Sequence, residues 1–166
     1  MTVTIEPDFE SFREQARKLL ALGVPPGRVQ WNDDASQAML LNEEPANYGQ
    51  PAIVKVPAAF MDLAKTVACH RDERRWAILY RMAYRLTLGG EKHLLSMTTD
   101  PDTRQANIWA KAIGRDIHKM HAFVRFRLVG EDDLTGREQF VAWFEPEHRI
   151  VKLAIPFFVK RFTGMD

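Results

Sequence analysis

The stretch RDIHKMHAFVRFR, residues 115–127, lies where the apolar pattern of the chain changes from helical to alternating. From the preceding residues as far as Met120, inside the stretch, apolar residues recur at the spacing of one helix face. After about His121, apolar residues occupy every second position from residue 122 to residue 128, which is typical of a half-buried strand. The stretch therefore predicts the end of a helix that is followed at once by a β-strand.

A hairpin and a last helix are predicted on the C-terminal side of this junction. Residues 130–136 are polar and contain two glycines, which suits a turn, and the alternation over residues 140–144 predicts the return strand. Pro146 suits the first turn of a helix, and Pro156 is expected to kink that helix.

Helices and two short strands are predicted on the N-terminal side. Apolar stripes at helical spacing cover residues 8–22, 57–70, 72–88 and 100–121, and Asp8 and Asp100 are expected to cap the first and last of these. Residues 2–6 and 28–31 suit strands, and residues 32–51 suit a long polar loop. The chain is thus predicted to be α+β. A single domain over residues 1–166 would hold a short N-terminal strand–helix unit, a helical middle, an antiparallel β-hairpin and a kinked C-terminal helix.

Composition and motifs exclude several classes of protein. The 166 residues contain one cysteine, Cys69, which rules out an internal disulfide and a multi-cysteine metal site. No apolar run approaches the roughly 18 residues of a membrane span, and the N-terminus lacks the pattern of a signal peptide. We therefore expect a cytoplasmic protein without a membrane anchor. No phosphate-binding loop, dinucleotide motif or metalloprotease motif occurs, and we expect no metal and no cofactor.

The junction gathers basic side chains that suit a phosphate. The net charge is only +1, but residues 71–127 carry 12 basic and 6 acidic groups, a local excess of +6. Arg115 neighbours His118 and Lys119 on a helix, because residues three and four apart share a face. Arginine binds phosphate through two parallel hydrogen bonds. The candidate nucleic-acid-binding residues are Arg115, His118, Lys119, His121, Arg125, Arg127, Trp143 and Arg149. Ion pairs from these cations to Glu138, Glu145 or Glu147 are the alternative interpretation.

A second cluster, WFEPEHR at residues 143–149, follows the hairpin. Carboxylates and imidazoles are the commonest general acids and bases, so the candidate catalytic residues are His118, Glu145 and His148. The pattern favours a different role for Glu145, as a helix cap or as the ion-pair partner of an arginine in the hairpin. The sequence therefore leaves open whether the chain is an enzyme.

The runs KAIGRDIHKMHAFVRFR (residues 111–127) and FVAWFEPEHRIVKLAIPFFVKRF (residues 140–162) resemble the uncharacterised "probable DNA metabolism" domain. Residues 16–26, 56–86 and 91–95 resemble it as well. That domain occurs fused to, or encoded beside, uracil-DNA glycosylase superfamily proteins, and it is associated with a radical-SAM DNA repair protein. Residues 1–166 contain no glycosylase sequence, and relatives continue past the position of residue 166 into another short segment, so a single domain that lacks a short C-terminal continuation is one expectation.

The resemblance implies an accessory, DNA-binding role in DNA repair beside one of those proteins, while the catalytic residues of the family are not established. Two alternatives stay open. One is an enzyme that acts on a nucleic acid or nucleotide through His118 or His148 with Glu145. The other is a protein-interaction domain whose basic groups are internally paired.

Overall fold

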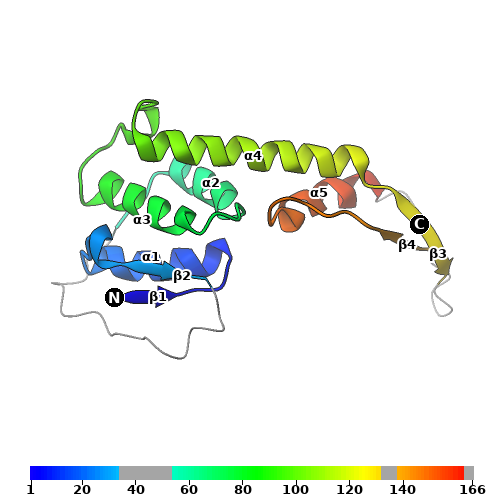
Figure 1. Cartoon of the computed structure of the whole chain (residues 1–166), viewed down its shortest axis with the longest axis horizontal. Coiled ribbons are helices and arrows are strands. Elements are labelled where there is room, and N and C mark those ends of the chain that lie inside the picture. Colours follow the sequence, from blue (N-terminus) through cyan, green and yellow to red (C-terminus); the bar gives the residue numbers. More distant parts are fainter. Residues whose placement is uncertain (34–53, 132–137, 163–166) are drawn as a thin grey trace. The chain divides into compact units, whose positions relative to one another are not determined.

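The computed structural model describes residues 1–33, 54–131 and 138–162 (Figure 1). The helices and strands, in chain order, are β1 (Thr2–Thr4), α1 (Phe9–Ala21), β2 (Gln30–Asn32), α2 (Ala58–Val67), α3 (Arg74–Thr87), α4 (Pro101–Phe123), β3 (Phe126–Glu131), β4 (Glu138–Ala142) and α5 (Val151–Phe162). Two 3₁₀ turns, Pro26–Arg28 and Leu94–Ser96, connect some of them. The chain divides into two compact units, Met1–Ala110 and Lys111–Asp166, so α4 contributes to both.

The N-terminal unit begins with a strand, a helix and a second strand. β1 pairs in parallel with β2, with Val3 opposite Trp31, and α1 connects them. The side chain of Asp8 accepts a hydrogen bond from the backbone N–H of Ser11 (2.9 Å) and caps α1, as predicted. Gly23 follows the helix with a φ of +69°, a conformation that side chains with a Cβ rarely adopt.

The core of this unit is formed by the inward faces of α1, α2 and α3 together with the first half of α4. The rings of Phe12 and Trp76 stack with their centroids 5.1 Å apart, and Trp109 of α4 is also buried. The Tyr80 hydroxyl donates a hydrogen bond to the carbonyl of Val24 (2.6 Å), and burial raises the pKa of Tyr80. The core therefore ties the loop after α1 to the middle of α3.

The C-terminal unit consists of the second half of α4, the β3–β4 hairpin and α5. α4 ends at Phe123, about two residues later than predicted, because the amide of Val124 still donates to the carbonyl of Met120 (3.1 Å). β3 begins at Phe126, so the prediction of a strand from residue 122 is wrong by one turn of helix. Among the described residues of this unit, the buried apolar side chains are Ile113, Val124, Ile150 and Ala154.

The last helix begins at Val151 and not at Pro146 as predicted. Residues 143–150 pass in irregular conformation along α4, where the backbone N–H of His148 donates to the carboxylate of Asp116 (2.8 Å). Pro156 does lie inside the helix, where it has no N–H to donate to the preceding turn.

The predicted α+β class is confirmed, with its strand–helix start, helical middle, antiparallel hairpin and proline-containing last helix. The predicted loop at 32–51 and turn at 130–136 fall mostly on residues 34–53 and 132–137, outside the described part of the chain. A single domain over residues 1–166, lacking a short C-terminal continuation, stays a prediction. In the described ranges, no helix combines the length and apolarity that a membrane crossing needs.

Candidate nucleic-acid interface

The outward side of α4 carries a row of basic residues in the C-terminal unit. Lys111, Arg115, His118 and Lys119 are all exposed, and their spacing of four, three and one residues keeps them on one side of the helix. Together with Gly114 they line an open depression. Ile113 and Asp116 lie on the opposite, buried side. We call Lys111, Arg115, His118 and Lys119 the α4 stripe.

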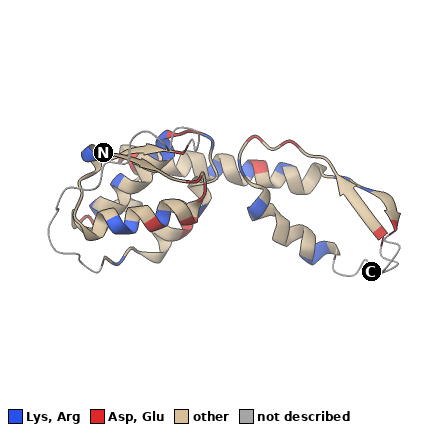
Figure 2. Cartoon of the chain, turned by 90° about the horizontal axis from the view of Figure 1, so that it is seen from below, with Lys and Arg blue, Asp and Glu red and all other residues tan. Residues whose placement is uncertain are grey.

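None of the carboxylates in the described ranges forms an ion pair with Lys111, Arg115 or Lys119. Ion pairs to three glutamates were the alternative interpretation of this basic cluster. These glutamates are exposed and form no ion pair with a described residue: Glu138, Glu145 and Glu147. The α4 stripe therefore keeps its positive charge available to a ligand. Figure 2 marks the Lys and Arg positions along the ribbon.

The arginines of α3 behave differently, because carboxylates of the N-terminal unit neutralise them. Arg81 donates two hydrogen bonds to Asp102, and Arg85 donates to Glu91 and Asp100 (2.8 and 2.7 Å). Hydrogen bonds from Arg85 lower the pKa of both Glu91 and Asp100. The excess of +6 over residues 71–127 is therefore concentrated toward α4 and the strand that follows it.

Arg127 lies on the side of the hairpin that faces away from α5. Phe126 on β3 packs against Phe158 and Phe162 of α5, with ring centroids 5.6 and 4.9 Å apart. Side chains alternate along a strand, so Arg127 and its cross-strand partner Val141 point to the other side. Both are exposed.

Arg125 and Trp143 flank that pair. Trp143, which follows β4, is 87% exposed. Arg125 precedes β3 and donates one guanidinium nitrogen to the carbonyls of Ala122 and Val124 (2.8 and 2.9 Å) at the end of α4. Its side chain is exposed, and its other guanidinium nitrogens donate no hydrogen bond to a described residue.

His121 does not join the α4 stripe. Its ring stacks on Phe157 of α5 with centroids 3.9 Å apart and meets the edge of Phe158, and its buried Nε2 atom has no hydrogen-bond partner in the described part of the chain. Helical spacing placed it near His118, but α5, more than thirty residues later in the sequence, covers it.

The candidate catalytic residues occupy different environments. His118 lies on the exposed side of α4, whereas His148 is buried next to Asp116 on the opposite side of that helix. Glu145 is exposed, as is the binding candidate Arg149. The described residues contain no group of three side chains that could hold a metal ion. The predicted acid–base pairs, Glu145 with His118 or with His148, stay predictions, and of the two histidines only His118 is exposed, as Glu145 is.

Sequence reasoning missed the role of Asp116. This is the one acid within residues 115–127, and it lies three residues after the buried Ile113, on the apolar side of the helix. An acid on the apolar side of a helix, inside a basic stretch, could have indicated that Asp116 has a structural role. Its carboxylate holds residues 143–150 against α4 through His148.

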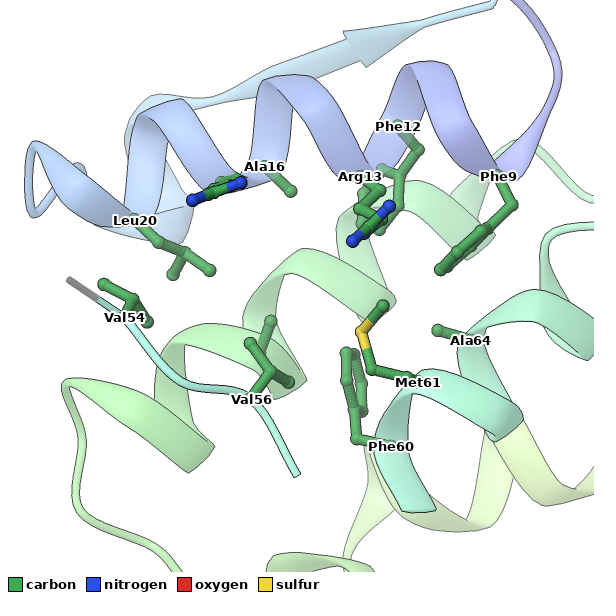
Figure 3. A pocket seen from close by; sticks show the side chains of 12 residues that line it. Phe9, Phe12, Arg13, Ala16, Leu20, Val54, Val56, Phe60, Met61 and Ala64 are labelled. Carbon is green, nitrogen blue, oxygen red and sulfur yellow. The ribbon is translucent and has the colours of Figure 1, made fainter. Parts of the chain in front are cut away.

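A separate cavity of about 280 Å³ lies in the N-terminal unit between α1 and α2 (Figure 3). Most of its lining residues are apolar, with Phe9, Phe60 and Met61 among the labelled side chains, and Arg13 and Arg17 also line it. None of the predicted site residues lines this cavity.

Comparison with known proteins assigns a family without an activity. A family model described as a domain of unknown function, DUF4130, matches residues 73–166. That range includes the α4 stripe, the hairpin and α5. No curated protein matches the chain, and no solved structure matches it.

Proposed function

Because the chain belongs to the DUF4130 family of domains of unknown function, we propose its function from its own surface: it binds nucleic acid through the exposed cations of residues 111–127. The α4 stripe and the two arginines at the start of the hairpin contact the phosphates.

One observation carries this proposal, namely the absence of described acid partners around Lys111, Arg115 and Lys119. Like charges four residues apart on a helix repel, so the mutual interaction of these side chains does not stabilise the fold. A polyanion supplies the missing counter-charge and releases its own condensed counterions on binding. The paired arginines of α3 provide the contrast within the same chain.

We propose DNA as the nucleic acid, and an accessory role in DNA repair, on the resemblance described above; the proposed location in the cytoplasm rests on the sequence pattern of residues 1–166. The same resemblance suggests a uracil-DNA glycosylase superfamily protein or a radical-SAM protein as the partner in that role. Arg149, exposed beside the buried His148, extends the set of candidate phosphate contacts.

Salt-dependent binding tests the proposal. Five cations, Lys111, Arg115, Lys119, Arg125 and Arg127, give a slope of log affinity against log salt of about −3.5 on a single strand or about −4.5 on a duplex. Affinity should then fall roughly 100- to 500-fold between 50 and 200 mM salt. Fluorescence anisotropy of a labelled oligonucleotide measures this, and a chain that shows no binding at 50 mM salt would refute the proposal.

A charge-matched pair of variants locates the surface. Arg115→Gln with Lys119→Gln removes two charges from the α4 stripe and should reduce the salt slope by about 1.4 to 1.8, because each phosphate contact contributes about 0.7 to 0.9. Arg28→Gln with Arg104→Gln removes two charges from exposed positions of the N-terminal unit and should leave the slope unchanged. Equal effects of the two double variants would mean that the net charge of the chain, and not the stripe, controls binding.

The enzyme alternative, in which His118 or His148 acts with Glu145, has less support, because His148 is buried beside Asp116 whereas Glu145 is exposed. Turnover of a labelled oligonucleotide that is abolished by His118→Ala would restore it. The protein-interaction alternative is favoured by a separate observation, the exposed apolar side chains Val151, Ile155 and Val159 at successive turns of α5. Capture of a protein partner that depends on Ile155, by a chain that binds no DNA, would select that alternative.

A further inference from the structure

Trp143 stands apart from the other tryptophans of the chain. Trp76 and Trp109 are buried, Trp31 is half-buried against Phe12 and Tyr80, and Trp143 is 87% exposed. A tryptophan ring is the largest apolar surface that a side chain can present, and its flat face suits stacking. Its exposure in the described structure therefore marks a place where a ring or an apolar group would bind.

Two arginines lie at the start of the strand that pairs with the one Trp143 follows. The register of the hairpin pairs Phe126 with Ala142 and Arg127 with Val141. Arg125 and Trp143 directly precede β3 and directly follow β4, in the positions that the same register would pair next. Cross-strand neighbours lie about 5 Å apart and diagonal neighbours about 7–8 Å apart, so both guanidinium groups are within reach of one ligand on the ring.

We propose that this side of the hairpin binds single-stranded nucleic acid in preference to a duplex, with an unpaired base stacked on Trp143. We call it the Trp143 face and define it as Arg125, Arg127, Val141 and Trp143. The inference rests on the proposed function and deepens it by naming the class of nucleic acid.

The single strand follows from what each group of the face offers. In a duplex the flat faces of the bases are covered by their neighbours, so an exposed ring finds no free base to stack on. A single strand can turn a base outward onto an aromatic side chain while cations follow its backbone. Two arginines beside the ring favour a polyanion over an apolar protein partner, because burying unpaired guanidinium groups against an apolar surface is costly. The chemistry selects an unstacked base with a phosphate on each side.

Tryptophan fluorescence of the whole chain is the direct test, since the other three tryptophans are packed within the N-terminal unit. A thymidine dodecamer should quench the emission of Trp143 and bind more tightly than a duplex of the same length. Trp143→Ala should weaken binding of the dodecamer by roughly 5- to 150-fold, the range for one stacked base, whereas Trp143→Phe should retain most of the affinity. Binding of inorganic polyphosphate should not change in either variant.

Two controls separate the outcomes. Phe123→Ala removes another exposed aromatic (67% exposed), which ends α4 and lies outside the Trp143 face, and it should leave the affinity for the dodecamer unchanged. Circular dichroism checks folding, which a change at so exposed a position as Trp143 should not disturb.

Several results would overturn the inference. Duplex binding as tight as dodecamer binding, an unchanged affinity in Trp143→Ala, or equal losses in the alanine and phenylalanine variants would do so, while the nucleic-acid proposal survived. A loss in Phe123→Ala as large as that in Trp143→Ala would also overturn it, because stacking would then not belong to this face. Absence of binding to the dodecamer and to the duplex alike would instead refute the proposed function itself.

Discussion

Replacing Arg75 with methionine should destabilise the N-terminal unit by about 3–5 kcal/mol, the usual cost of removing one partner of a buried ion pair. Arg75 has no exposed surface. Its guanidinium donates to the carbonyls of Ala68 (3.1 Å) and Asp72 (3.0 Å) and to the carboxylate of Asp33, whose side chain is only 11% exposed. Methionine fills much of the same volume but donates to none of these oxygens.

Urea unfolding followed by tryptophan fluorescence measures this loss. Trp31, Trp76 and Trp109 all lie in the N-terminal unit and report on it. With a dependence on urea of about 2 kcal/mol per molar, the midpoint should fall by roughly 1.5–2.5 M. The loss is a large share of the 5–15 kcal/mol that typically stabilises a domain.

The adjacent Arg74 provides the matched control. It also pairs with an aspartate, Asp72, but its side chain is 74% exposed. Water and salt screen such a pair, so Arg74→Met should barely move the midpoint. If Arg75→Met shifts the midpoint no further than Arg74→Met does, then the buried guanidinium does not hold the start of α3 to Asp33 and the end of α2 as argued.

Two further predictions concern acids that the fold depends on. Because Arg85 lowers the pKa of Asp100 and Glu91, these carboxylates stabilise the chain above their ordinary pKa values of about 4, and that contribution is lost as the pH falls through their lower folded values. Arg85→Gln should therefore lower the thermal midpoint at pH 7, and its difference from the wild type should shrink progressively as the pH falls below about 4. A difference that stays constant from pH 7 to pH 2 would contradict this reasoning. Asp116→Ala removes the acceptor of the buried His148 N–H and should cost about 1–3 kcal/mol, with faster exchange of that amide hydrogen, whereas Asp116→Asn keeps an acceptor and should exchange more slowly than the alanine variant.

Local patterns predicted the elements well where the stabilising contact is itself local. The cap of Asp8 on the N–H of Ser11 spans three residues, and the sequence identified it. The end of α4 was placed about two residues early, since alternation begins near residue 122 while the helical hydrogen bond from Val124 to Met120 persists. The sequence predicts that the last helix begins at Pro146. No residue close to Pro146 indicates that the carboxylate of Asp116, 32 residues before His148, binds the His148 amide.

The candidate site divides in the same way. Helical spacing alone predicts that Arg115, His118 and Lys119 are neighbours, whereas Lys111, which completes the α4 stripe, is not among the predicted site residues. His121 has the same spacing but stacks on Phe157, a contact that depends on how α5 packs against α4. The burial of Arg75 depends on Asp33, 42 residues away, and a basic residue in a charged stretch carries no sign of such a partner.

The β-bulge between Leu128 and Gly130 divides the hairpin into two sections with separate registers. In the section that begins at Phe126, the ring of Phe126 packs against Phe158 and Phe162. In the distal section, where Gly130 pairs with Gln139, the register is shifted by one position. Insertions at the distal section need not propagate into the anchored one, since the extra residue already uncouples the two alternations. For a protein engineer, that makes the distal section the natural place to graft a reporter peptide while the tryptophan stays in position.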